Sequence, residues 1–144
     1  MKKMVFSLFI IIFIFSLTAC SAKKKNSNNS YGVKDLTKII INEKEYDIVL
    51  EDNETTNSLI KHLPLKITMS ELNRNEKYAN LDTTLPTNEY NPKHINKGDV
   101  MLFGDNCLVI FYKSFDTSFS YTKIGHISDL DDLGSGSIKV ILDK

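Results

Sequence analysis

The chain has 144 residues with 18 basic and 18 acidic side chains, so its formal net charge at pH 7 is zero. Lys2 and Lys3 are the only charged residues among the first 19, so the remainder carries 16 basic and 18 acidic side chains. A chain this close to neutral lacks the basic surface that nucleic-acid binding requires, and its length suits one domain. We therefore expect a single folded domain that does not bind nucleic acid.

The first 19 residues predict a lipoprotein signal peptide. Lys2 and Lys3 precede a largely apolar run over residues 4–17, which is shorter than the roughly 20 apolar residues that span a membrane. The run leads into Leu-Thr-Ala-Cys at residues 17–20, which resembles the lipobox of bacterial lipoproteins, where the cysteine is acylated and the chain is cleaved just before it. An ordinary secretory signal with an incidental cysteine is the alternative. We expect acylated Cys20 to insert into membrane lipid and to anchor the protein on the outer face of a bacterial cell membrane.

Residues 20–36 follow the signal peptide and are rich in lysine, asparagine and serine. Such a segment has too few apolar side chains to form a core, so we expect a flexible tether. The second cysteine, Cys107, has no partner for a disulfide if Cys20 carries lipid. Because Cys107 lies in an apolar run, we expect a buried thiol that packs as a small hydrophobic side chain.

The first half of the domain, which we place at residues 37–144, predicts three strands and one helix. Alternating apolar residues on both sides of a polar turn at 42–44 predict a hairpin over residues 39–50. Asp52-Asn53 can cap a helix over residues 55–63, which Pro64 would end. Leu65, Ile67 and Met69 alternate with polar residues and predict the third strand.

The second half predicts further short strands around one long loop. We expect strands over residues 77–81, 100–103, 107–112, 121–127 and 138–142, a loop over 82–97 and a helical turn over 129–133. Seven or eight short strands with one or two short helices indicate a closed or nearly closed β-barrel. Strand 107–112 is apolar on both faces, so we expect a central strand with Phe111 in the core and the helix against its outer face.

Five stretches of the chain together resemble the bacterial cyclophilin-like domain family. They occur in order, with similar gaps, over most of residues 37–142, and read TMSELN (68–73), NEKY (75–78), GDVMLFG (98–104), FYKSF (111–115) and YTKIG (121–125). The resemblance implies a mostly β fold, a closed eight-stranded cyclophilin-like β-barrel with one or two short helices. It implies no established activity.

The same resemblance raises prolyl isomerase activity as an alternative function. Isomerases among the cyclophilins carry a strand-borne arginine, which hydrogen-bonds the substrate while an amide bond with a barrier of about 18–20 kcal/mol rotates. The single arginine of this chain, Arg74, falls in a polar turn, and the chain has no tryptophan and no glutamine. The sequence therefore favours a binding module, with a peptidyl-prolyl isomerase that assists secreted proteins as the alternative.

An aromatic segment over residues 113–121 is the strongest candidate for a ligand site. Phe115, Phe119 and Tyr121 are separated by polar and hydroxyl residues, without aliphatic neighbours. These rings either plug the end of the barrel or form the floor of a groove for a peptide or small apolar ligand. We assign the candidate groove to these three residues together with Tyr78 and Arg74, in a protein expected to be a monomer.

Other polar residues give weaker signals. The three histidines lack the spacing of metal ligands, so we expect no metal and no cofactor. Glu71 and Glu76 lie near Tyr78 and could supply polar contacts to a ligand. A solvated turn is the interpretation that their polar neighbours favour.

The lipobox predicts the effect of one substitution. Cys20→Ser removes the thiol that accepts the lipid, so the variant should either remain as an uncleaved precursor or leave the membrane fraction. Metabolic labelling with palmitate, followed by membrane fractionation, measures both effects. Continued labelling of the serine variant would contradict the lipobox interpretation.

Overall fold

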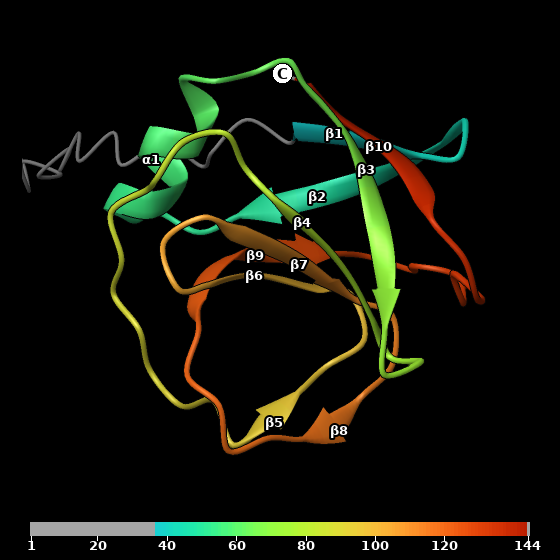
Figure 1. Cartoon of the computed structure of the whole chain (residues 1–144). Helices are drawn as coiled ribbons and strands as arrows, with labels where there is room; N and C mark the ends of the chain where they lie inside the picture. Colours follow the sequence, from blue (N-terminus) through green and yellow to red (C-terminus); the bar gives the residue numbers. More distant parts are fainter. Residues whose placement is uncertain (1–36, 144) are drawn as a thin grey trace, which may run out of the picture.

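Residues 37–143 are described by a computed structural model, and the predicted signal peptide, Cys20 and the tether lie outside them. Eight antiparallel strands close into a barrel in the order β1-β10-β3-β4-β7-β6-β9-β2, while β5 and β8 form a separate two-stranded sheet (Figure 1). The elements are β1 (Thr37–Ile41), β2 (Lys44–Leu50), α1 (Glu54–Ile60), β3 (Leu65–Leu72), β4 (Glu76–Asn80), β5 (His94–Ile95), β6 (Asp99–Phe103), β7 (Cys107–Phe111), β8 (Phe115–Asp116), β9 (Thr122–Ile127) and β10 (Ile138–Asp143). The closed barrel expected from the sequence is confirmed.

The barrel closes within the described residues because β1 pairs with β2 on one side and with β10 on the other. Side chains from alternate positions of the strands fill its interior, as in other small barrels. The predicted hairpin is present, and Asn42 and Glu43 form its turn with φ values of 47° and 71°. Residues 37–143 thus hold a complete barrel with its own core. Within this range no helix has the length and apolar character needed to cross a membrane.

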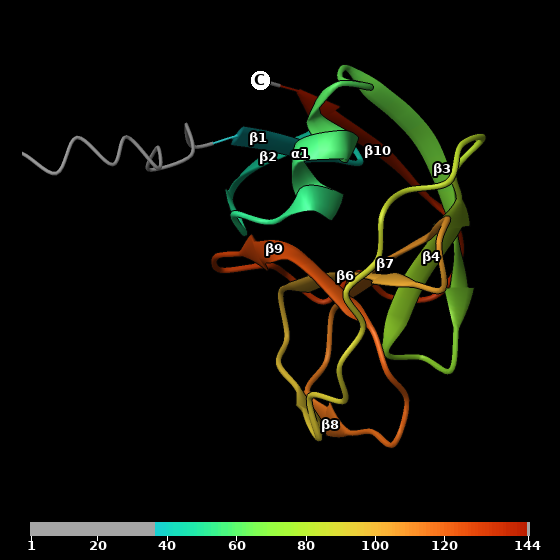
Figure 2. The same ribbon diagram turned by 90° about the vertical axis from the view of Figure 1, so that its left-hand side faces the viewer.

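Helix α1 closes one end of the barrel (Figure 2). The predicted cap at Asp52-Asn53 is present, and Asn53 forms it, because its side-chain oxygen accepts a hydrogen bond from the Thr56 backbone N–H at 2.8 Å. The helix is shorter than predicted, since the backbone bonds after Ile60 span three residues and tighten the chain into turns. Leu59 packs into the barrel core, and the hydroxyl of Thr55 donates to the Pro86 carbonyl at 2.6 Å.

Strand β7 is buried on both faces, as its sequence predicts. Leu108 and Ile110 belong to the interior core, while Val109 and Phe111 belong to a second cluster outside the barrel. The expectation that the helix covers this outer face is wrong. The long loops that carry β5 and β8 cover it instead (Figure 2), with Ile95 in the second cluster. Helix α1 has only seven residues and packs on one end of the barrel, so it does not reach the outer face of β7.

The segment between β9 and β10 closes the opposite end of the barrel. The predicted helical turn at residues 129–133 is wrong, because Asp129 has φ 51° and the chain then runs on as an irregular loop. Leu130 packs into the core. The carbonyls of Gly134 and Gly136 accept hydrogen bonds from Lys77, at 2.6 and 2.7 Å.

The double burial of β7 predicts the cost of a cavity. Ile110 has no exposed surface, so Ile110→Ala should lower the free energy of unfolding by about 2–5 kcal/mol. Lys113→Ala, two residues beyond the end of the strand and half exposed, should cost less than about 0.5 kcal/mol. Denaturant unfolding of both variants measures the difference. Equal midpoints would contradict the placement of Ile110 inside the barrel.

Candidate functional site

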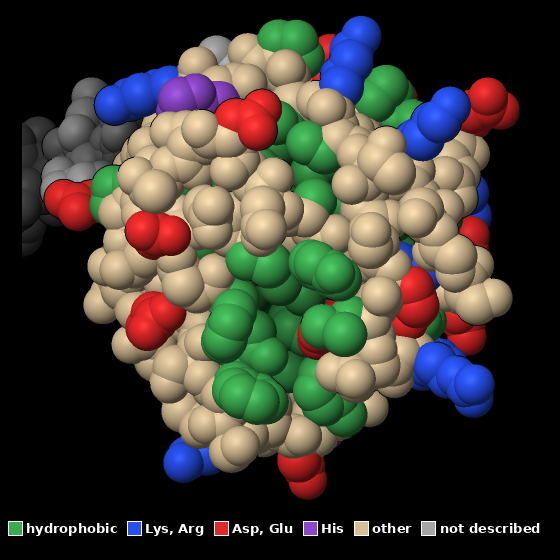
Figure 3. Space-filling view, in the orientation of Figure 1, with side chains coloured by type: hydrophobic (Ala, Val, Ile, Leu, Met, Phe, Trp, Pro, Cys, Tyr) green, Lys and Arg blue, Asp and Glu red, His purple; other side chains and the backbone are tan. Residues whose placement is uncertain are grey.

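A pocket of about 390 Å³ lies on the outer face of the barrel, beside strands β3, β4, β6 and β7. Apolar side chains gather around this hollow in the space-filling view (Figure 3). It is lined by Leu72, Asn73, Glu76, Tyr78, Phe103, Cys107, Val109, Phe119 and Tyr121. Its floor continues the second cluster, to which Val109 and Tyr121 belong.

The pocket concentrates exposed apolar surface. Among the described residues five large hydrophobic side chains are exposed, and three of them line this pocket: Leu72 at 42%, Phe103 at 46% and Phe119 at 61%. Phe103 makes an edge-to-face contact with Phe119, with 6.1 Å between ring centroids, and a tilted contact with Tyr121 at 5.7 Å. Apolar side chains gathered in this way mark surfaces that bind a ligand or a partner.

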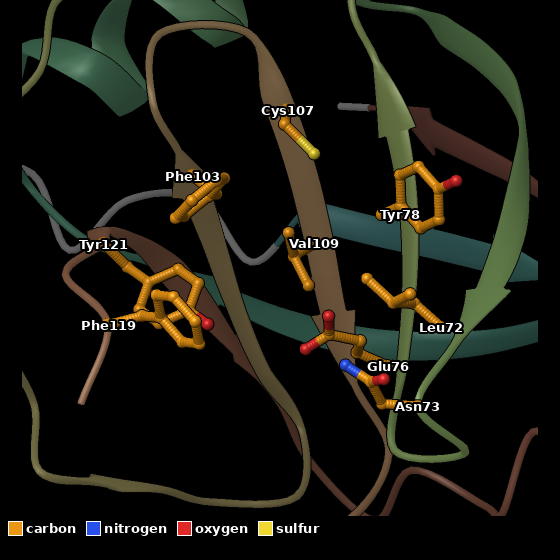
Figure 4. A pocket seen from close by; sticks show the side chains of 9 residues that line it. All are labelled: Leu72, Asn73, Glu76, Tyr78, Phe103, Cys107, Val109, Phe119 and Tyr121. Carbon is orange, nitrogen blue, oxygen red and sulfur yellow. The ribbon is translucent and has the colours of Figure 1, made fainter. Parts of the chain in front are cut away.

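Three of the five residues that we assigned to the groove line the pocket: Tyr78, Phe119 and Tyr121 (Figure 4). Phe115 lies outside the lining, half-buried in β8, where its ring packs 5.6 Å from that of Phe111. Arg74 also lies outside the lining, exposed in the turn between β3 and β4 with φ 58°. The segment of residues 113–121 therefore divides between a ring on the second cluster and rings in the pocket.

Sequence reasoning missed five of the lining residues: Leu72, Asn73, Phe103, Cys107 and Val109. Phe103 ends β6 next to a turn, and nothing in its local sequence separates it from a core residue. Cys107 is half-buried at the start of β7, so the expectation of a buried thiol is corrected. Burial first, and then the neighbouring charge of Glu76, raise the pKa of this thiol, which weakens it as a nucleophile.

Glu76 is the one acidic side chain among the lining residues. Only 9% of the residue is exposed, and its carboxylate points into the pocket (Figure 4). No hydrogen bond or ion pair joins this carboxylate to another described residue. Burial, and then the negative charge of Glu71, raise the pKa of Glu76 to about 7. The interpretation of Glu71 and Glu76 as a solvated turn is therefore wrong.

Glu71 lies on the other side of the sheet, in a polar network inside the barrel. It pairs with the buried ammonium of Lys77 and accepts the Tyr112 hydroxyl, at 2.8 and 2.9 Å from its two oxygens. Burial opposes the ionisation of Glu71, but the hydrogen bonds from Lys77 and Tyr112 outweigh it and lower its pKa. Burial and the bond to Glu71 raise the pKa of Tyr112 to about 12. This network holds fixed charges and is not part of the pocket lining.

A further pair of titratable side chains, His126 and Asp99, lies outside the pocket lining. The His126 imidazole lies 3.0 Å from Asp99, whose second oxygen accepts the Asn96 backbone N–H at 2.9 Å and fixes the turn before β6. Within residues 37–143 no three histidine, cysteine or acidic side chains come close enough together to hold a metal ion. The chemistry available in the pocket is therefore that of apolar contact, hydroxyl and amide hydrogen bonds, one carboxyl group and one thiol.

Comparison with known proteins gives one match. The model of a family described as the cyclophilin-like family matches residues 39–143, which include all of the barrel strands except the first two residues of β1. Searches of curated proteins and of solved structures gave no match.

The raised pKa of Glu76 predicts how stability changes with pH. Because its folded-state pKa of about 7 lies above the ordinary value of 4.5, the folded chain holds this proton more tightly than the unfolded chain. The contribution of Glu76 to stability is therefore full below about pH 4.5 and is lost as the pH rises to about 7. Glu76→Gln removes this loss and should raise the free energy of unfolding at pH 8 by about 1–2 kcal/mol. The full pKa shift would correspond to a larger value, but water in the open pocket screens the charge.

Denaturant unfolding at pH 4 and pH 8 measures the effect of this substitution. At pH 4 the glutamine variant should match the unchanged chain. Glu89→Gln removes an equal charge from an exposed loop and should change neither value. A Glu76→Gln variant no more stable at pH 8 than the unchanged chain would contradict the burial of an unpaired carboxylate.

Proposed function

The chain belongs to the cyclophilin-like family, and from that premise we propose that it is a lipid-anchored extracytoplasmic binding module whose outer pocket holds a peptide or a small apolar ligand. A barrel of this family supports a binding or isomerase-like module. One observation carries the choice: three of the five large hydrophobic side chains exposed among the described residues converge on one hollow.

The size and lining of the pocket suit such a ligand. A volume of about 390 Å³ lies within the range of small-molecule sites, which are mostly apolar with a few polar groups that fix orientation. Phe103, Phe119 and Leu72 supply the apolar contacts, and Asn73 and Glu76 supply the polar ones. The hollow accommodates one or two apolar side chains of a peptide that lies across it.

The isomerase alternative has less support. An isomerase of this fold needs a preorganised cationic donor beside the twisting amide, and the lining residues include no arginine or lysine. Arg74 is exposed in its turn and outside the lining. Asn73 offers a neutral amide donor, which stabilises a substrate carbonyl less well than a guanidinium.

The anchoring part of the proposal rests on the sequence before residue 37. The lipobox ending in Cys20 and the polar segment that follows support a domain held outside the bacterial membrane on a tether of about 17 residues. Because the barrel is closed without this segment, a flexible tether would leave the barrel free to rotate relative to the membrane.

Phe119→Ala tests the pocket as a binding site. Since the ring is 61% exposed, its removal should cost less than about 1 kcal/mol of stability. It should weaken binding of the tetrapeptide succinyl-Ala-Phe-Pro-Phe-p-nitroanilide about tenfold, because an aromatic contact is lost. Nuclear magnetic resonance titration of residues 37–144 measures the affinity and maps the perturbed residues.

Val49→Ala is the matched control, because Val49 is exposed on β2 and does not line the pocket. It should leave the affinity unchanged. A peptide that perturbs no lining residue, or a Phe119→Ala loss of stability equal to that of Ile110→Ala, would overturn the proposal. The same tetrapeptide in a protease-coupled assay reports proline isomerisation, and acceleration would instead support the isomerase.

A further inference from the structure

We propose that the pocket selects organic cations, with an ammonium group carried on an apolar body, which pairs with the Glu76 carboxylate while the rings of Phe103, Phe119 and Tyr121 surround the body. The inference rests on the proposed function and deepens it by naming the class of ligand. It depends on three features of the pocket: an unpaired acid, the absence of a cation among the lining residues, and aromatic walls.

The Glu76 side chain is largely buried, and its carboxylate opens into the hollow without a partner among the described residues. The residue as a whole is nine-tenths buried, and its carboxylate points into the hollow (Figure 4). A charge that has lost part of its hydration is costly unless it is paired, so a ligand that brings a positive charge gains more here than a neutral ligand does. An anionic ligand would meet repulsion from Glu76.

The two cationic residues nearest to Glu76 in the sequence, Lys77 and Arg74, do not line the pocket. Lys77 follows Glu76 on β4, so strand alternation turns its side chain to the barrel interior. There its ammonium is bound by Glu71 and by two backbone carbonyls. Arg74 lies exposed in the turn, outside the lining. The position opposite Glu76 is therefore left for a cation from a ligand.

The groups whose charge acts on Glu76, from inside the barrel or from the pocket wall, add no positive charge to the pocket. Glu71 on β3 contributes negative potential, and Cys107 on β7 and Tyr121 before β9 are neutral acids whose own pKa values the charge of Glu76 helps to raise. Tyr78 on β4 and Asn73 in the turn complete the polar lining. The potential in the pocket is thus negative whenever Glu76 is ionised.

The aromatic walls favour the same ligand. The faces of phenylalanine and tyrosine rings carry negative charge density and attract cations, most strongly where water is excluded. Phe103 stands edge-to-face to Phe119 and tilted to Tyr121, so the three rings form adjoining walls. Pockets that combine aromatic rings with an acid are well suited to ammonium groups.

Binding of a permanent cation should depend on pH through Glu76. With its pKa at about 7, the ionised fraction falls from about 0.9 at pH 8 to about 0.1 at pH 6. The apparent affinity should fall by about tenfold over this interval, since only the ionised form pairs with the ligand. In turn, the bound cation should lower the pKa of Glu76.

Benzyltrimethylammonium and benzyl alcohol test the inference as a charged and an uncharged probe of residues 37–144. The ammonium probe keeps its charge at every pH, so changes in its binding report on the protein alone. Nuclear magnetic resonance titrations at pH 6 and pH 8 would compare the unchanged chain with Glu76→Gln, Glu89→Gln and Phe119→Ala. Glu89→Gln matches the change in net charge in an exposed loop residue outside the lining.

We expect the ammonium probe to bind more tightly than benzyl alcohol at pH 8 and to lose about tenfold in affinity at pH 6. Glu76→Gln should remove both the preference and the pH dependence, and Glu89→Gln should remove neither. Equal binding of the two probes, or unchanged binding of the cation to Glu76→Gln, would overturn the cation inference. If Phe119→Ala still weakened both probes in that case, the proposed binding function would stand; if no probe and no tetrapeptide perturbed the pocket, both proposals would fail.

Discussion

The buried ammonium of Lys77 makes the contacts that hold one end of this barrel closed. It has no exposed surface, and its partners come from β3, through Glu71, and from the segment before β10, through the carbonyls of Gly134 and Gly136. An ammonium inside a barrel requires such partners, because breaking a buried ion pair typically costs about 3–5 kcal/mol. The same network fixes the Tyr112 hydroxyl and holds the irregular loop between β9 and β10 across the end of the barrel opposite α1.

The inward position of Lys77 also decides which way its neighbour Glu76 points, because successive side chains of a strand lie on opposite faces. Because Lys77 points inward and is satisfied there, Glu76 points outward into the pocket with no lysine to neutralise it. The polarity of the pocket is thus a consequence of how the barrel end is closed. The second cluster supplies the rest: Val109 and Phe111 on the outer face of β7 need cover, and the loops that cover them also bring Tyr121 to the floor of the pocket and Phe119 to its rim.

The sequence alone determined most of the fold. Alternation of apolar residues predicted the barrel strands to within a few residues, since period-two patterns report a strand with one buried face. Asn53 marked the start of the helix, and polar turn residues marked the hairpins, because these are local preferences of the backbone. The resemblance in five stretches predicted the closed eight-stranded barrel. Errors in the fold fell where local signals end: the length of α1, the loop at residues 129–133 and the cover over β7.

The candidate site was decided by tertiary structure. Phe115 and Phe119 have similar neighbours in the sequence, yet one packs on the second cluster and the other lines the pocket, because β8 pairs with β5 and fixes where each ring points. Glu71 and Glu76 look alike in the same polar stretch, and only the barrel separates them, one paired inside and the other unpaired outside. Local sequence encodes which face of a strand is apolar. It does not encode which distant segment covers that face or which charge finds a partner, because those depend on contacts between residues far apart in the chain.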